Sequence, residues 1–179
     1  MASHEDPPPF ARWTEPLLRL PCWGVQQGYS SFLTLEFGEP YLSIRNSSQT
    51  RPDSELPAYR SPRLKGEWHL WIYCCGWTIT QDDERLADYE SSDPEIAAAC
   101  GKLEGQMLSR VAMLPETGQS VLAFDLGGRI DTEPFGTDLL EQWHLFGPGA
   151  RCFTYRSDGA ACLSRSDTPP DERRWSRPQ

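Results

Sequence analysis

The stretch from Gly66 to Thr80 has the sequence GEWHLWIYCCGWTIT and decides the expected fold. Its side chains alternate with period two, so one face carries Trp68, Leu70, Ile72 and Cys74. The other face carries His69, Trp71, Tyr73, Cys75, Trp77 and Ile79. Because both faces are apolar, the pattern predicts a central strand that is covered on both sides.

Further strands are expected on either side of this stretch. Residues 31–37 and 41–45 alternate around Gly38-Glu39-Pro40, which predicts a hairpin. Residues 46–65 are rich in Ser, Pro, Asp and Arg and predict a long loop. The second half of the chain predicts strands at residues 120–126, 129–132, 139–146, 151–155 and 160–164. Ser157-Asp158-Gly159 joins the last two and is typical of a hairpin turn.

Residues 92–114 carry the pattern of one long helix. Ser92-Asp93-Pro94-Glu95 forms a plausible helix start, and Pro115 ends the pattern. Apolar residues follow at spacings of three and four, which places them on one stripe: Ile96, Cys100, Leu103, Met107, Val111 and Leu114. A second stripe is mostly small: Ala97, Gly101, Gly105, Leu108 and Ala112. We expect it to pack against another backbone of the same domain, with a partner helix as the alternative.

The order of these elements predicts an α+β fold. We expect a mainly antiparallel sheet of about seven to eight strands, with one long helix inserted after the third strand. A length of 179 residues fits one domain, which we place at residues 13–166. Residues 1–12 are expected to be a disordered tail and residues 167–179 a flexible one.

The charge is negative and unevenly spread. Twenty-six acids against 17 Lys and Arg give a net charge of −9, which argues against non-specific binding to nucleic acid or an anionic membrane. Acids are dense after the central strand, and five of them form a candidate docking face for a basic protein partner: Asp82, Asp83, Glu84, Asp88 and Glu90. Solubility alone is the alternative explanation of these charges.

Cysteine usage and hydropathy indicate the compartment. The chain has six cysteines, opens on a polar, Pro-rich segment and contains no run of 18 apolar residues. We therefore expect a cytoplasmic protein without a membrane span, whose thiols stay reduced. Cys74 and Cys75 are neighbours in a strand and point to opposite faces, so the even cysteine count does not indicate a disulfide framework.

No motif specifies a reaction, a cofactor or a metal. A nucleophilic site could draw on His69 or His144, Cys74 or Cys75, and Asp125, but nothing in their spacing requires one. Gly127-Gly128 is not followed by the Lys-Ser/Thr pair of a phosphate-binding loop. The cysteines also lack the paired short spacing of a structural zinc site. We therefore expect no cofactor and no metal, and we favour a protein without enzymatic activity.

The aromatic face of the central strand leaves two interpretations open. His69, Trp71, Tyr73 and Trp77 either fill the core beneath the helix or line an exposed pocket. The second interpretation predicts a small-ligand binder or an enzyme with a cleft over residues 68–79, because Trp and Tyr are enriched at binding hot spots.

The whole chain resembles the small single-domain bacterial proteins that include immunity proteins of toxin systems. The features that carry the resemblance are the chain length, the order of strands, helix and strands, the segments EWHLWIYCCGW and FDLGG (124–128), and the acidic surface. The resemblance implies a non-enzymatic protein-binding module, here an immunity-type inhibitor that docks a basic partner through its acidic face. It assigns no individual functional residue.

Overall fold

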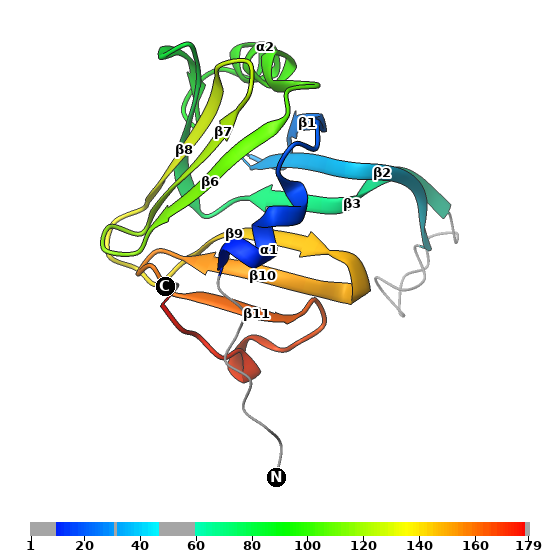
Figure 1. The fold of residues 1–179 in the computed structure, drawn as a ribbon, viewed down its shortest axis with the longest axis vertical. Coiled ribbons are helices and arrows are strands. Elements are labelled where there is room, and N and C mark those ends of the chain that lie inside the picture. Colours follow the sequence, from blue (N-terminus) through cyan, green and yellow to red (C-terminus); the bar gives the residue numbers. More distant parts are fainter. Residues whose placement is uncertain (1–9, 31, 47–59, 178–179) are drawn as a thin grey trace, which may run out of the picture.

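The computed structural model describes residues 10–30, 32–46 and 60–177. In this part of the chain, eleven antiparallel strands form two sheets (Figure 1). The larger sheet has the order β1 (Cys22–Gln27), β2 (Leu33–Asn46), β3 (Arg60–Ile72), β9 (Glu141–Gly147), β10 (Arg151–Arg156) and β11 (Ala161–Arg165). The smaller sheet has the order β5 (Glu84–Asp88), β4 (Cys75–Gln81), β8 (Gly128–Pro134), β7 (Gln119–Phe124) and β6 (Leu108–Leu114).

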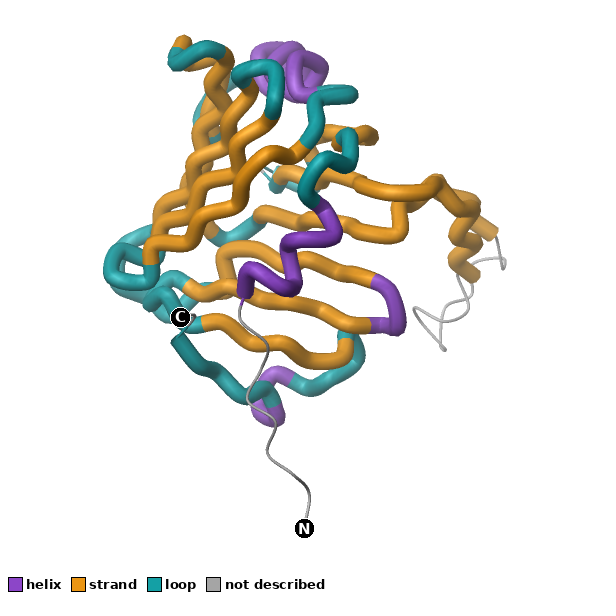
Figure 2. The backbone as a smooth tube through the Cα atoms, viewed as in Figure 1, coloured by secondary structure: helices purple, strands orange, loops and turns teal. Residues whose placement is uncertain are grey.

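The chain passes from one sheet to the other at two places. Tyr73 and Cys74 connect β3 to β4, and residues 135–140 connect β8 to β9. The two sheets splay apart from this side, and the short helix α1 (Phe10–Thr14) lies across the opening with the 3-10 turn Glu15–Leu17 (Figures 1 and 2). Helix α2 (Asp93–Leu103) closes one end of the molecule beside β1 and β5. The remaining 3-10 turns are Pro148–Ala150 and Pro170–Glu172.

The core fills the space between the sheets. Period-two alternation directs every second side chain of each strand inward. The bulkiest fully buried side chains come from both sheets and from the segments that cover them: Trp77, Trp143, Tyr155, Phe37, Leu17, Leu33, Leu35, Ile72, Ile79, Ile96, Leu103 and Leu108. The indole N–H of Trp143 donates to the hydroxyl of Ser120 at 3.0 Å, which satisfies a polar group that this burial takes away from water.

The expectation of an α+β fold with one long helix after the third strand is wrong. The protein is mainly β, and the helix follows the fifth strand and spans only residues 93–103. It begins as expected, because Ser92 and Glu95 form a capping box. It ends because Gly105 adopts a φ of +81°, a left-handed conformation that terminates helices. Beyond it, residues 108–114 form the edge strand β6.

The expected hairpin at residues 31–45 is also wrong, because both runs belong to the single strand β2. A bulge between Phe37 and Pro40 accommodates Gly38-Glu39, and the strand continues beyond it. Its partner is β3, so residues 60–65 of the expected loop are strand, while residues 47–59 lie outside the described part. By contrast, the turn at Ser157-Asp158-Gly159 joins β10 and β11 as expected.

The two expected tails differ in what the structure describes. Of the first twelve residues, 1–9 lie outside the described part, and α1 begins at Phe10. The segment from Asp167 to Arg177 contacts the larger sheet. Ser176 exchanges backbone hydrogen bonds with Ala161, and the guanidinium of Arg156 lies 4.3 Å from the ring centroid of Trp175.

Candidate functional site

A continuous group of aromatic rings lies on the outer face of the larger sheet. Because alternate side chains of a strand point to opposite sides, Trp68, Leu70 and Ile72 enter the core, while His69 and Trp71 point outward, as does Tyr73 beyond the end of β3. The neighbouring strand β9 adds two further rings, since His144 is the Cα partner of Trp71 and Phe146 that of His69.

These rings contact one another across the strands. Trp71 and Tyr73 stack with centroids 4.7 Å apart, and Tyr73 stacks on His144 at 5.1 Å. Phe32, which immediately precedes β2, meets Trp71 and Tyr73 edge-on at 5.9 and 5.6 Å. We define the aromatic row as Tyr29, Phe32, His69, Trp71, Tyr73, His144 and Phe146.

Exposure changes along the aromatic row. His144 is buried, whereas Phe32, His69, Trp71, Tyr73 and Phe146 are half-buried. Tyr29 is 86% exposed and meets Phe32 edge-on at 6.2 Å. The aromatic row therefore has a fixed base on the sheet and an exposed end at the β1–β2 turn.

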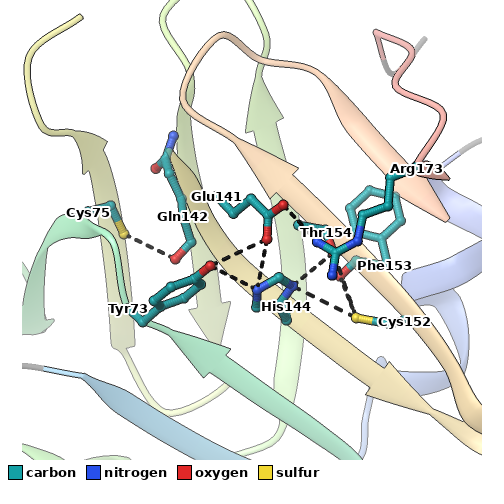
Figure 3. Close-up of polar contacts among 9 residues, drawn as sticks. All are labelled: Tyr73, Cys75, Glu141, Gln142, His144, Cys152, Phe153, Thr154 and Arg173. Atoms are coloured by element: carbon teal, nitrogen blue, oxygen red, sulfur yellow. Dashed lines mark hydrogen bonds and ion pairs between the residues drawn. The ribbon is translucent and has the colours of Figure 1, made fainter. Parts of the chain in front are cut away.

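A polar network supports the base of the aromatic row (Figure 3). His144 Nδ1 lies 2.8 Å from the hydroxyl of Thr154, and Nε2 lies 3.1 Å from the hydroxyl of Tyr73. Tyr73 donates in turn to Glu141 at 3.4 Å, and Glu141 also forms an ion pair of 2.7 Å with Arg173. One assignment gives each of these three hydrogen bonds a donor and an acceptor: Thr154 donates to Nδ1, Nε2–H donates to Tyr73, and Tyr73 donates to Glu141.

Burial sets the charge state of this network. Removal from water lowers the pKa of His144 from 6.5 to about 4, with Glu141 acting against the shift and Arg173 adding to it. The imidazole is therefore neutral at pH 7, as the assignment above requires. Burial also raises the pKa of Tyr73, so its hydroxyl stays protonated and able to donate.

The thiol of Cys152 lies 3.8 Å from His144 Nδ1, an arrangement that could in principle pair a nucleophile with a base. Catalysis of that kind needs a thiolate. Here burial raises the pKa of Cys152 to about 11, and the hydroxyl of Thr154 occupies the nearer position at the imidazole. The thiol and the imidazole are therefore both neutral, and Cys152 belongs to the polar network that supports the aromatic row.

A second histidine pairs with a buried carboxylate. His69 Nδ1 lies 2.8 Å from Glu36 Oε1, and Glu36 Oε2 accepts the backbone N–H of Gly66 at 2.9 Å. These partners compensate the burial of Glu36 and hold the ring of His69 against Phe146 at the far end of the aromatic row.

The state of His144 gives a testable pH dependence. Its pKa in the folded protein is below that of the unfolded chain, so the unfolded chain binds the extra proton first. Stability is then complete above about pH 6.5 and declines as the pH falls toward 4. We expect the wild type to lose about 2–3 kcal/mol more than His144→Gln between pH 7 and pH 4.5. Urea titrations of both proteins at the two pH values measure this difference, and equal losses would contradict a neutral buried His144.

The five acids that the sequence singled out fall into two groups. Asp82 and Asp83 form the turn between β4 and β5, and Glu84 begins β5, all three exposed. Asp88 ends the strand about 13 Å away, and Glu90 follows in the next turn. Asp88 also accepts the backbone N–H of Glu90 at 3.0 Å. The structure thus brings Asp82, Asp83 and Glu84 together and keeps Asp88 and Glu90 as a separate pair.

Of the four residues of the alternative pocket, the structure brings three together. His69, Trp71 and Tyr73 share the outer face, where they belong to the aromatic row. Trp77 lies in β4 of the other sheet, 1% exposed, inside the core. The reason is the passage between the sheets at Tyr73-Cys74, which interrupts the expected single strand.

The sequence predicts four of the seven residues of the aromatic row as candidate site residues: His69, Trp71, Tyr73 and His144. Tyr29, Phe32 and Phe146 are not among the predicted candidates, and His144 is among them only as a member of a possible nucleophilic site. Period-two alternation in residues 141–147 could have placed His144 and Phe146 on one face, but the pairing of β9 with β3 joins segments about 70 residues apart. Glu36, Glu141 and Arg173 carry no local signal that would connect them to this face.

Residues 10–30, 32–46 and 60–177 contain no group of three or more His, Cys, Asp or Glu side chains that could hold a metal ion. Within the same ranges, no helix is long and apolar enough to span a membrane. The six cysteines are all free, and only Cys74 is not fully buried.

No family model, no curated protein and no solved structure matches this chain.

Proposed function

We propose that this chain is a non-enzymatic protein-binding module and that the aromatic row is its contact surface. The single observation that carries the proposal is the set of seven contacting rings on the solvent side of the larger sheet. Aromatic side chains that are held rigidly contribute large contact areas at a low cost in conformational entropy, and Trp and Tyr dominate binding hot spots.

The burial pattern supports a contact surface of this kind. In a hot spot a few residues, enriched in Trp and Tyr, carry most of the binding energy, and rigid aromatic anchors lose little conformational entropy on binding. The network around His144 fixes the base, and Tyr29 is the exposed anchor at the end of the row. The neutral Cys152–His144 pair below adds rigidity and offers no activated nucleophile, which favours binding over catalysis.

The acidic turn of Asp82, Asp83 and Glu84 supports a finer version of the proposal, in which the partner is basic. Three adjacent exposed carboxylates on a tight turn attract a cationic surface and accelerate its association. An immunity-type inhibitor of a basic toxin would use such steering. The six free thiols fit a reducing cytoplasm as its compartment.

Site-specific photo-crosslinking in the source cells tests the proposal. Tyr29 is replaced by the photoreactive residue p-benzoylphenylalanine, and the matched control carries it at Leu126, which is exposed on the loop between β7 and β8. We expect a discrete protein adduct from position 29 and none from position 126. Adding Trp71→Ala should remove the adduct, because Trp71 supports the row beneath Phe32.

Two outcomes would overturn the proposal. Position 29 would yield no more adduct than position 126, or the adduct would persist at full strength with Trp71→Ala in a protein of unchanged stability. A small molecule bound to the row instead of a protein would give the first of these results. The finer version fails separately if Asp83→Lys leaves the adduct and its salt dependence unchanged.

A further inference from the structure

Residues 167–177 lie against the outer face of the larger sheet, and we call them the strap. His144 is opposite Thr154, and Thr154 is opposite Cys162, so these side chains and that of Cys152 share the outer side. Although this side faces away from the smaller sheet, Cys152, Thr154 and Cys162 are only 4%, 1% and 2% exposed. Burial raises the pKa of Cys162, and a hydrogen bond from the backbone of Arg174 is among the effects that act against the shift. The strap therefore lies over this thiol.

Two side chains anchor the strap to the sheet. The guanidinium of Arg173 reaches β9 and pairs with Glu141 at 2.7 Å (Figure 3). The ring of Trp175 lies against the guanidinium of Arg156 in β10, 4.3 Å from the ring centroid, a distance typical of a cation–π contact. Arg173 and Trp175 are two positions apart, so both point to the same side of an extended chain. The strap is thus held by one charged and one aromatic side chain.

The backbone of the strap adds a contact with the edge of the sheet. Ser176 donates to the carbonyl of Ala161 at 2.9 Å and accepts from its N–H at 2.7 Å, which forms a bridge to β11. The other side chains contribute little, because only Thr168, Arg173 and Trp175 of the strap are not exposed. An extended segment that pairs with a sheet edge and inserts alternate side chains is the pattern of peptide recognition by strand addition.

The fit of the strap is incomplete. Nε of Arg173 is buried and has no acceptor among the described residues, and a buried donor without a partner costs free energy. The backbone forms an isolated bridge with β11 instead of a continuous ladder. Segments with few buried contacts open locally without unfolding of the whole domain. We therefore expect that the strap can be displaced while the sheet beneath it stays folded.

We propose that the outer face of β9, β10 and β11 is a peptide-binding site that the strap occupies in cis. The partner is a protein segment with an Arg and a Trp two positions apart. For such a segment the site offers Glu141 to the guanidinium, Arg156 to the aromatic ring and the edge of β11 to the backbone. The strap is then an autoinhibitory cover that the partner segment displaces. None of these three contacts involves a ring of the aromatic row, so the site is distinct from it.

Thiol labelling of the wild type tests whether the strap opens locally. Cys152 and Cys162 lie beneath the strap, whereas Cys22 and Cys75 belong to the core. We expect iodoacetamide to modify the first pair at least about tenfold faster than the second, because local opening of the strap is more frequent than unfolding of the domain. Mass spectrometry of the digested protein identifies the modified residues. Equal rates for all four thiols would overturn the displaceable strap.

Binding of a free peptide tests the site itself. The probe is a fluorescein-labelled synthetic peptide of residues 167–177, and the receptor is the full chain, either wild type or Arg173→Gln/Trp175→Ala. A tethered segment competes at an effective concentration on the order of millimolar, so the wild type should bind the peptide weakly. The double variant loses both anchors of its own strap, and its dissociation constant, measured by fluorescence anisotropy, should be at least about tenfold lower. Arg174→Gln is the matched control, because this side chain is exposed, and it should stay within about twofold of the wild type.

Substitutions in the peptide test which side chains are recognised. On the double-variant receptor, peptides with Arg173→Gln or Trp175→Ala should bind at least about tenfold more weakly than the parent peptide, and one with Arg174→Gln within about twofold of it. Near-ultraviolet circular dichroism verifies that each receptor retains its packed core, and the single variant Trp175→Ala provides a second, milder receptor.

Two outcomes of these titrations would overturn the proposal. The double variant would bind the parent peptide no more tightly than the wild type does, or the Trp175→Ala peptide would bind as well as the parent. No ring of the aromatic row is changed in any of these variants, so the result is independent of the photo-crosslinking experiment.

Discussion

Gly159→Ala should lower the free energy of unfolding by about 3 kcal/mol or more, among the largest effects of any single substitution here. Gly159 turns the chain between β10 and β11 at a φ of +78°, where a side chain costs about 1–2 kcal/mol. A Cβ at this position would also overlap the carbonyl oxygen of Pro115, which belongs to the backbone and cannot rotate away. Displacing it adds roughly 1–3 kcal/mol.

This position matters because it joins the two sheets. A Cβ added at Gly118, in the turn between β6 and β7, would likewise overlap the carbonyl oxygen of Ser157. The two turns therefore touch backbone to backbone, one from each sheet. Gly159→Ala should separate them, so its effect extends beyond its own hairpin.

Gly149→Ala is the matched control for this prediction. Gly149 has a similar φ of +72°, but no other atom lies within 4 Å of an added Cβ. It should cost only the conformational term of about 1–2 kcal/mol. Denaturant titrations of the two variants measure the difference. Equal shifts of the midpoint would show that the turns do not need their close contact.

Signals confined to a few residues were predictable from the sequence. The Asp158-Gly159 turn and the capping box of Ser92 and Glu95 depend on neighbours within four positions, and both are present. The alternation at residues 66–80 placed His69, Trp71 and Tyr73 on one face for the same reason. These local rules fix an element without reference to the rest of the chain.

Features that depend on the whole fold were not predictable. Leu42 and Ile44 are exposed because the smaller sheet does not extend far enough to cover them. No local sequence pattern encodes how far that sheet extends. The aromatic row depends on pairing that brings His144 beside Trp71. Trp77 continues the alternation of His69, Trp71 and Tyr73 in the sequence but lies in the other sheet, because the chain passes between the sheets at Tyr73-Cys74. Register and layer are set by contacts distant in sequence.

The helix illustrates how one pattern can serve two structures. Ile96, Cys100, Leu103, Met107, Val111 and Leu114 keep helical spacing across Gly105, although the helix ends before it. Beyond Gly105, the inward position of Val111 arises from strand alternation and from packing against the core. The same spacing of three and four residues therefore occurs in a helix before Gly105 and in a strand after it.

The final prediction distinguishes a helix that ends at Leu103 from one long helix, through the unfolding free energies of two variants. Leu103 is fully buried at the end of α2, and Leu103→Ala should cost about 2–5 kcal/mol, as large-to-small changes in a packed core do. Met107 precedes β6, is 42% exposed and is held by its backbone N–H, which donates to Asp125. Met107→Ala keeps that hydrogen bond and should cost less than about 1 kcal/mol. One long helix would bury both side chains and make the two costs similar. Denaturant midpoints of the two variants decide between these outcomes, and a loss for Met107→Ala as large as that for Leu103→Ala would contradict the end of the helix at Leu103.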